Sequence, residues 1–96
     1  STGEAKVPLK GEREEIMSSV KNAFSDYEAN TADGVRIRYD GHLGIEAGWF
    51  LCRPSNTEPI LVMRAEANSQ KGLDTIQNDV EKRIGKIIDL SLFHEA

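Results

Sequence analysis

Two apolar runs with a short polar segment between them constrain the fold of this chain more than any other feature. The runs are residues 49–52 (WFLC) and 60–63 (ILVM), and the polar segment is residues 53–59 (RPSNTEP), with a proline near each end. Short apolar runs bounded by turn residues are typical of buried strands. Because the connection is short, we expect strands over residues 49–53 and 60–67 to pair antiparallel.

The rest of the chain predicts two amphipathic helices and at least one more strand. Residues 12–28 and 73–90 carry apolar side chains at helical spacing. Residues 35–40 alternate between apolar and polar, as in a half-buried strand. The predicted fold class is therefore α+β. It is a small antiparallel sheet of three to four strands, covered on one face by two helices and open on the other, where another domain could pack.

The chain of 96 residues has the length of one small domain. We predict a mobile leader or inter-domain connector over residues 1–10, the domain itself over 11–90, and a frayed tail over 91–96, unless Leu92 and Phe93 dock on the core. No segment has the length of a membrane span, and no signal peptide opens the sequence. We therefore expect a cytoplasmic protein that does not bind membranes.

Charge and cysteine content argue against several function classes. The formal net charge of −4 disfavours a nucleic-acid binder, which normally carries a basic face, but leaves room for a local anion site. Cys52 lies in an apolar run without Cys or His neighbours at ligand spacing, so it is predicted to be a buried core residue. His42 and His94 have no partners in sequence and are predicted to be surface or turn residues.

The polar segment between the strands has the chemistry of an anion site. The guanidinium of Arg53 can hold two phosphate oxygens at once. Ser55, Asn56 and Thr57 each add a side-chain donor, and the flanking prolines limit the freedom of the loop before binding. The same residue types also make an ordinary polar hairpin turn, and composition alone does not choose between the two. The glycines and lysine of a nucleotide P-loop are missing.

Arg64, on the following strand, shares a face with Val62 and Glu66 by alternation. It either returns toward Arg53 and reinforces the anion site, or holds Glu58. Alternatively it pairs with Glu66 as an ordinary arginine on the sheet surface.

Residues 48–59 (GWFLCRPSNTEP), followed by residues 62–67 (VMRAEA), resemble the C-terminal domain of the α-D-phosphohexomutases. The Arg-Pro-Ser-Asn-Thr-Glu-Pro form of the loop resembles the phosphomannomutase/phosphoglucomutase branch, whereas phosphoglucosamine mutases usually have Ser-Gly-Thr there. The resemblance implies a TATA-box-binding-protein-like α+β fold. It also implies a part in an isomerase of carbohydrate metabolism that interconverts hexose 1-phosphate and hexose 6-phosphate by intramolecular phosphoryl transfer.

By this resemblance, the phosphate that is not reacting is held by Arg53, Ser55, Asn56 and Thr57, with Arg64 as a weaker contact. The family's phosphoserine and Mg²⁺ belong to other domains, so we expect no catalytic residue, metal ligand or cofactor in this chain, and no activity from it alone. The expected partners are a hexose phosphate and the remaining domains of the parent mutase, with no nucleic acid and no membrane. The alternatives are a phosphoglucosamine mutase domain, or a stand-alone anion-binding or interaction module without enzymatic activity.

Overall fold

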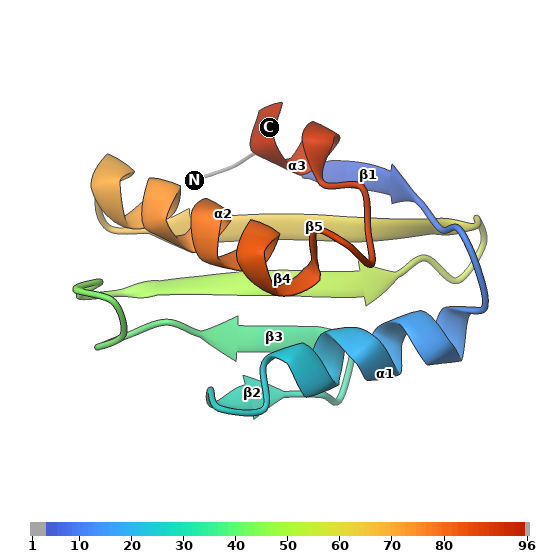
Figure 1. Ribbon diagram of the computed structural model, residues 1–96, viewed down its shortest axis with the longest axis horizontal. Helices are drawn as coiled ribbons and strands as arrows, with labels where there is room; N and C mark the ends of the chain where they lie inside the picture. The colour runs from blue at the N-terminus through green and yellow to red at the C-terminus, as the bar shows by residue number, and fades with distance from the viewer. Residues whose placement is uncertain (1–3, 96) are drawn as a thin grey trace.

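Five antiparallel strands form a single sheet in the computed structural model, which describes residues 4–95 (Figure 1). The sheet has the order β1-β5-β4-β3-β2. Its strands are β1 (Ala5–Pro8), β2 (Ala29–Asn30), β3 (Val35–Arg38), β4 (Gly48–Pro54) and β5 (Ile60–Ala67). The helices are α1 (Arg13–Ala23), α2 (Gln70–Ile84) and α3 (Ser91–Glu95). The predicted α+β class is confirmed, with more strands than the three to four expected.

Strand alternation places the core between the sheet and the helices. Phe50 and Cys52 on β4, and Leu61 and Met63 on β5, are almost completely buried. Helix α1 packs over β3 and β4 and helix α2 over β4 and β5, so both long helices cover the same face (Figure 1). The predicted antiparallel hairpin is confirmed, with Cys52 opposite Met63. None of the helices in the described part of the chain is long and apolar enough to cross a membrane.

The expected leader contributes an edge strand. Strand β1 pairs with β5, Ala5 lying opposite Met63, and both Ala5 and Val7 are buried. A mobile leader is therefore the wrong description of residues 5–8, whereas residues 1–3 lie outside the described part. The strand was not predicted because it is only four residues long, too short for its alternation of buried and exposed residues to stand out. It ends at Pro8, which has no N–H to donate to a neighbouring strand.

Both helices begin or end at other residues than the periodicity suggested. Helix α1 ends at Ala23 rather than near residue 28, although Tyr27 still packs against the core. Helix α2 begins at Gln70, because the hydroxyl of Ser69 accepts the N–H of Gly72 at 3.0 Å and caps the helix. It ends at Ile84, ahead of the predicted residue 90.

The C-terminal segment is ordered by a buried aromatic side chain. Phe93 of α3 is fully buried and packs edge-on against Phe50, with ring centroids 5.5 Å apart. The Nε2 atom of His94 lies 2.9 Å from a carboxylate oxygen of Glu81, so this histidine has a partner that the sequence did not reveal. The prediction of a frayed tail is therefore wrong for residues 91–95, which form a helix. Phe93 docks on the core, as the alternative prediction allowed, whereas Leu92 is 47% exposed.

Candidate functional site

The open face of the sheet carries the predicted site residues. Arg53 on β4 and Arg64 on β5 occupy the alternate positions that point away from the helices. Arg53 lies opposite Val62, and Arg64 lies opposite Leu51. The two arginines are therefore diagonal neighbours on one face, a relationship that separates such positions by roughly 7–8 Å. Two of the predicted site residues thus share one side of the molecule.

The loop after β4 is closed by its own backbone. The N–H of Ser55 donates to the carbonyl of Ile60 at 3.0 Å, and the N–H of Ile60 donates to the carbonyl of Glu58 at 2.8 Å. The N–H of Leu9 donates to the carbonyl of Pro59 at 2.8 Å and ties the loop to the segment that follows β1. These bonds hold the loop residues at one end of the β4–β5 hairpin.

Ser55 organises the middle of the loop. Its Oγ accepts the backbone N–H groups of Thr57 and Glu58, both at 3.3 Å, in the manner of a serine turn. Because Oγ serves these bonds as an acceptor, its own hydroxyl proton remains available for donation. The hydroxyl of Thr57 lies 3.5 Å from this Oγ, at the limit of a weak hydrogen bond.

The remaining donors of the loop are uncommitted within residues 4–95. Arg53 is half-buried, and its guanidinium has neither an ion pair nor a hydrogen bond with a described residue. Asn56 and Thr57 are exposed at the tip. Arg53, Ser55, Asn56 and Thr57 therefore offer several donors within a few residues, and carboxylates do not compete for them among the described residues.

Arg64 is exposed and also lacks an ion pair in the described part of the chain. The suggested pairs with Glu58 and with Glu66 are therefore not formed. Arg64 shares the open face of the sheet with Arg53, and a contribution to the anion site stays a prediction.

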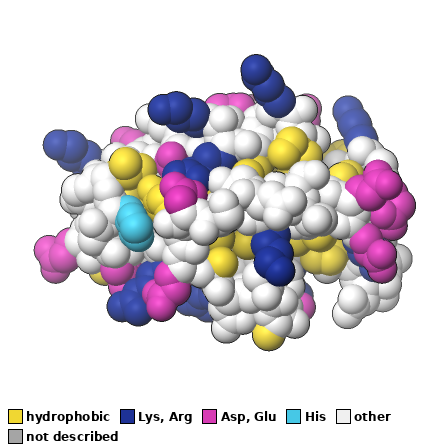
Figure 2. All heavy atoms as spheres, turned by 60° about the horizontal axis from the view of Figure 1, so that its bottom comes forward, with side chains coloured by type: hydrophobic (Ala, Val, Ile, Leu, Met, Phe, Trp, Pro, Cys, Tyr) yellow, Lys and Arg dark blue, Asp and Glu magenta, His cyan; other side chains and the backbone are white. Residues whose placement is uncertain are grey.

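Positive charge gathers on this open face of an acidic chain. The outward-facing positions of β1, β3, β4 and β5 carry the basic residues Lys6, Arg36, Arg53 and Arg64 and the acidic residue Glu66. Arg38 is on the same face but is neutralised, since its guanidinium contacts Asp40 at 2.9 Å and Glu28 at 3.4 Å. By contrast, Figure 2 looks toward the edge of the molecule formed by α1 and β2, where acidic and basic side chains are interspersed.

Two surface hollows lie beside this region rather than at the loop itself. The larger, of about 780 Å³, is bordered by residues 28–32 together with Arg36, Arg38 and Trp49. The guanidinium of Arg36 stacks 4.6 Å above the ring of Trp49 there. The smaller, of about 450 Å³, reaches Gly34 and Pro54 at the base of the loop. A group bound at the exposed loop would contact this chain from one side, so the donors of the loop define the site and a hollow is not needed there.

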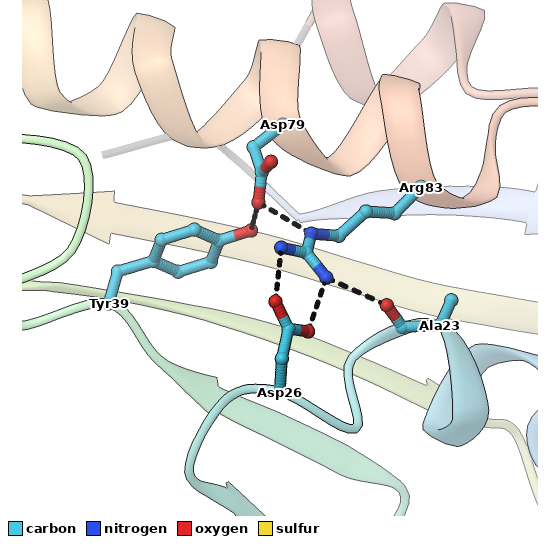
Figure 3. A network of polar contacts seen from close by, with 5 residues as sticks. All are labelled: Ala23, Asp26, Tyr39, Asp79 and Arg83. Atoms are coloured by element: carbon cyan, nitrogen blue, oxygen red, sulfur yellow. Dashed lines mark hydrogen bonds and ion pairs between the residues drawn. The ribbon is translucent and has the colours of Figure 1, made fainter.

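A polar network that sequence reasoning missed joins α2 to the other elements (Figure 3). Arg83 grips both carboxylate oxygens of Asp26, at 2.7 and 3.0 Å, and its Nε donates to Asp79 at 2.9 Å. Arg83 also donates to the carbonyl of Ala23 at 2.8 Å, and the hydroxyl of Tyr39 donates to Asp79 at 2.7 Å. The hydrogen bond from Arg83 lowers the pKa of Asp26, whereas burial raises the pKa of Tyr39. These groups satisfy one another, so the network is structural.

Neither a reactive thiol nor a metal site is found among residues 4–95. Burial raises the pKa of the Cys52 thiol to about 12, which keeps it protonated at neutral pH. No three or more His, Cys, Asp or Glu side chains of residues 4–95 gather as metal ligands would. His42 stacks on the ring of Tyr27, with centroids 4.1 Å apart.

Comparison with known proteins identifies the family of this chain. The family model described as phosphoglucomutase/phosphomannomutase, C-terminal domain, matches residues 4–83. A phosphomannomutase/phosphoglucomutase of Pseudomonas syringae is 40% identical over 72% of this chain and 14% of its own length. A phosphomannomutase of Methanocaldococcus jannaschii is 34% identical over 80% of this chain and 16% of its own length.

More distant similarities extend the same picture. A probable phosphoglucosamine mutase of Methanocella arvoryzae is 31% identical over 82% of this chain and 17% of its own length. The crystal structure of a phosphoglucomutase/phosphomannomutase family protein from Burkholderia thailandensis superposes with a TM-score of 0.66 at 27% identity, covering 88% of this chain and 17% of that one. The chain therefore spans only about a sixth of the length of these relatives. From the family match and the shared fold, this chain belongs to the family of phosphoglucomutase/phosphomannomutase C-terminal domains.

Proposed function

We propose that this chain is the substrate-phosphate-binding C-terminal domain of a phosphohexomutase that interconverts hexose 1-phosphate and hexose 6-phosphate. The observation that carries the proposal is the cluster of uncommitted donors at the end of the β4–β5 hairpin. Arg53 has no carboxylate partner among residues 4–95, and Ser55 already orders the loop that presents Asn56 and Thr57. These donors are free to bind an anion because no carboxylate among residues 4–95 occupies them.

The donors suit a phosphate monoester. The planar fork of Arg53 matches two phosphate oxygens, and Ser55, Asn56 and Thr57 supply single hydrogen bonds to the others. Hydrogen bonds to a charged group contribute roughly 1.5–3 kcal/mol each, and association costs at least about 4 kcal/mol. We therefore expect dissociation constants in the micromolar to millimolar range, which suit a substrate that must leave.

In the parent enzyme the loop would hold the phosphate that is not reacting. A group of donors around one phosphate tolerates either end of a bisphosphorylated intermediate, because it does not depend on the sugar. Its contribution to the reaction is positioning, which can lower a barrier by several kcal/mol. Arg64 adds positive charge on the same face and is proposed as the weaker contact.

The reacting groups are assigned to other parts of a longer protein. The described residues do not fit Mg²⁺, since they lack a gathered set of oxygen ligands. We propose that the Mg²⁺ of the parent is bound elsewhere, along with the phosphorylated serine, and that this chain alone is inactive. We also propose a cytoplasmic location, where the free, buried Cys52 would stay reduced.

The proposal is tested by titrating the ¹⁵N-labelled chain with glucose 1-phosphate. We expect shifts centred on residues 53–57, and their loss in Arg53→Ala. The matched control is Arg38→Ala, since Arg38 is on the same sheet face but already paired with Asp40. Equal binding by Arg53→Ala and the wild type, or shifts centred elsewhere, would show the site assignment to be wrong.

The similarity to probable phosphoglucosamine mutases supports a second candidate substrate, a hexosamine phosphate. Because the loop is proposed to hold phosphate rather than sugar, this domain should bind glucose 6-phosphate and glucosamine 6-phosphate alike. A stand-alone module without an enzymatic parent would instead lack coding sequence for the other mutase domains next to its own.

A further inference from the structure

We propose that Gly34 is a positioning residue, which fixes the direction of the Arg53 side chain toward the phosphate. The inference rests on the proposed function and extends it to a residue outside the loop. Gly34 directly precedes β3, whose first residue Val35 pairs with Cys52. It therefore lies beside Arg53 on the neighbouring strand.

The approach of the two strands is closer at Gly34 than any side chain would allow. A Cβ on Gly34 would lie 2.6 Å from the Cβ of Arg53, 2.6 Å from the carbonyl oxygen of Cys52 and 2.8 Å from the Cα of Arg53. These atoms belong to the backbone or to the base of a side chain, so a rotamer change cannot relieve the overlap. A side chain at this position must displace β4 at Arg53.

This contact matters because the Arg53 side chain has no polar partner beyond its Cβ among residues 4–95. Its guanidinium has no ion pair or hydrogen bond with residues 4–95, so the direction of its Cα–Cβ bond and its local packing decide where the fork points. Gly34 packs directly against that bond. A small displacement there is carried along the whole length of the side chain to the guanidinium.

The chain offers a matched control for the backbone conformation of Gly34. Gly34 has φ +79° and Gly41 has φ +81°, both in the left-handed region that L residues adopt at a cost. A Cβ on Gly41 meets no atom within 4 Å. Substitution at Gly41 thus reports backbone strain alone, whereas substitution at Gly34 reports strain plus the contact with Arg53.

The experiment compares Gly34→Asn with Gly41→Asn in the full chain, because asparagine tolerates the left-handed region better than most residues. The readouts are the dissociation constant for glucose 1-phosphate, the thermal midpoint and the Arg53 Nε–Hε resonance of the free protein. Both variants should lose some stability. Gly34→Asn should also raise the dissociation constant about tenfold or more and shift the Arg53 resonance. Gly41→Asn should leave the dissociation constant within about twofold of the wild type.

The outcomes separate the inference from the proposed function. If the wild type binds, Arg53→Ala does not, and folded Gly34→Asn binds like the wild type, the positioning role is wrong and the function stands. If the wild type shows no shifts at residues 53–57, the function fails and the positioning role fails with it. Should Gly34→Asn not fold, the χ1 scalar couplings of Arg53 in the free wild type decide: one populated rotamer supports a fixed direction of the side chain, and averaging over several rotamers overturns the positioning role.

Discussion

The hydroxyl of Tyr39 donates a 2.7 Å hydrogen bond to the carboxylate of Asp79, and this contact joins the segment after β3 to helix α2. The same carboxylate accepts from Arg83, whose guanidinium also stacks 4.4 Å from the ring of Tyr27. The helix layer is therefore locked to the sheet by polar and aromatic contacts. The opposite face of the sheet is left to the arginines of the proposed site.

Removing Arg83 should destabilise the fold without affecting phosphate binding. Arg83→Ala removes the ion pair to Asp26 and leaves Asp79, whose side chain is 12% exposed, without its cation. We expect a loss of about 2–3 kcal/mol in the free energy of unfolding, measured by chemical denaturation. The control is Lys82→Ala, an exposed neighbour that should cost under about 0.5 kcal/mol. Similar losses for the two variants would show that the network contributes little.

The C-terminal segment should be needed for stability. Phe93→Ala removes a fully buried ring that packs on Phe50, and should cost about 3–5 kcal/mol. Leu92→Ala, in the same short helix but 47% exposed, should cost less than about 1 kcal/mol. Thermal unfolding of the two variants distinguishes a docked helix from a frayed end, since a frayed end would make both changes neutral.

Stability should fall at high pH because Cys52 keeps its proton when folded. Burial raises the pKa of its thiol from 9.0 to about 12, so the folded-state value lies above the unfolded one. The stabilising effect is complete below pH 9 and is lost as the pH rises from 9 to 12, because only the unfolded chain releases the proton. One such group changes the free energy of unfolding by about 1.4 kcal/mol per pH unit.

The measurement is denaturation of the wild type and Cys52→Ala at pH 9 and pH 10. The burial of Tyr39 raises its pKa from 10.0 and acts in the same direction, but only at higher pH. The variant should be less stable overall and show a flatter dependence on pH in this window. Parallel curves for the two proteins would contradict the assignment to Cys52.

The fold was largely predictable from the sequence because its strongest signals are local. The apolar runs on either side of the loop gave the β4–β5 pair, and helical spacing gave α1 and α2. Strand β1 and helix α3 were missed, as was the two-residue strand β2, because none of these elements is longer than five residues. Strand β1 and helix α3 owe their order to contacts with distant residues, such as that of Phe93 with Phe50.

The candidate site was predictable as a set of residue types but not as an arrangement. The loop residues are contiguous, so their proximity followed from sequence. The relation of Arg53 to Arg64 needed the register of the hairpin, which places Arg53 opposite Val62. The contact with Gly34 depends on how closely β3 approaches β4, and the spacing of residues along the chain carries no such information.

Arg64 should contribute to phosphate binding through charge rather than through close contact. It is an exposed diagonal neighbour of Arg53 without an ion pair among residues 4–95. Exposed charge pairs are worth about 0.2–1 kcal/mol, so Arg64→Ala should weaken glucose 1-phosphate binding by a factor of roughly 1.4 to 5. Arg53→Ala should weaken it by about tenfold or more, since it removes hydrogen bonds to a charged group as well.

Salt should separate the two contributions. The long-range attraction of an exposed Arg64 is screened as ionic strength rises, so the difference between the wild type and Arg64→Ala should shrink from low salt to roughly 0.5 M salt. The difference for Arg53→Ala should persist, because hydrogen bonds at short range are screened less. Arg38→Ala is the control, since Asp40 and Glu28 already neutralise this arginine on the same face. An Arg64 effect as large as that of Arg53 at high salt would instead indicate direct contact with the phosphate.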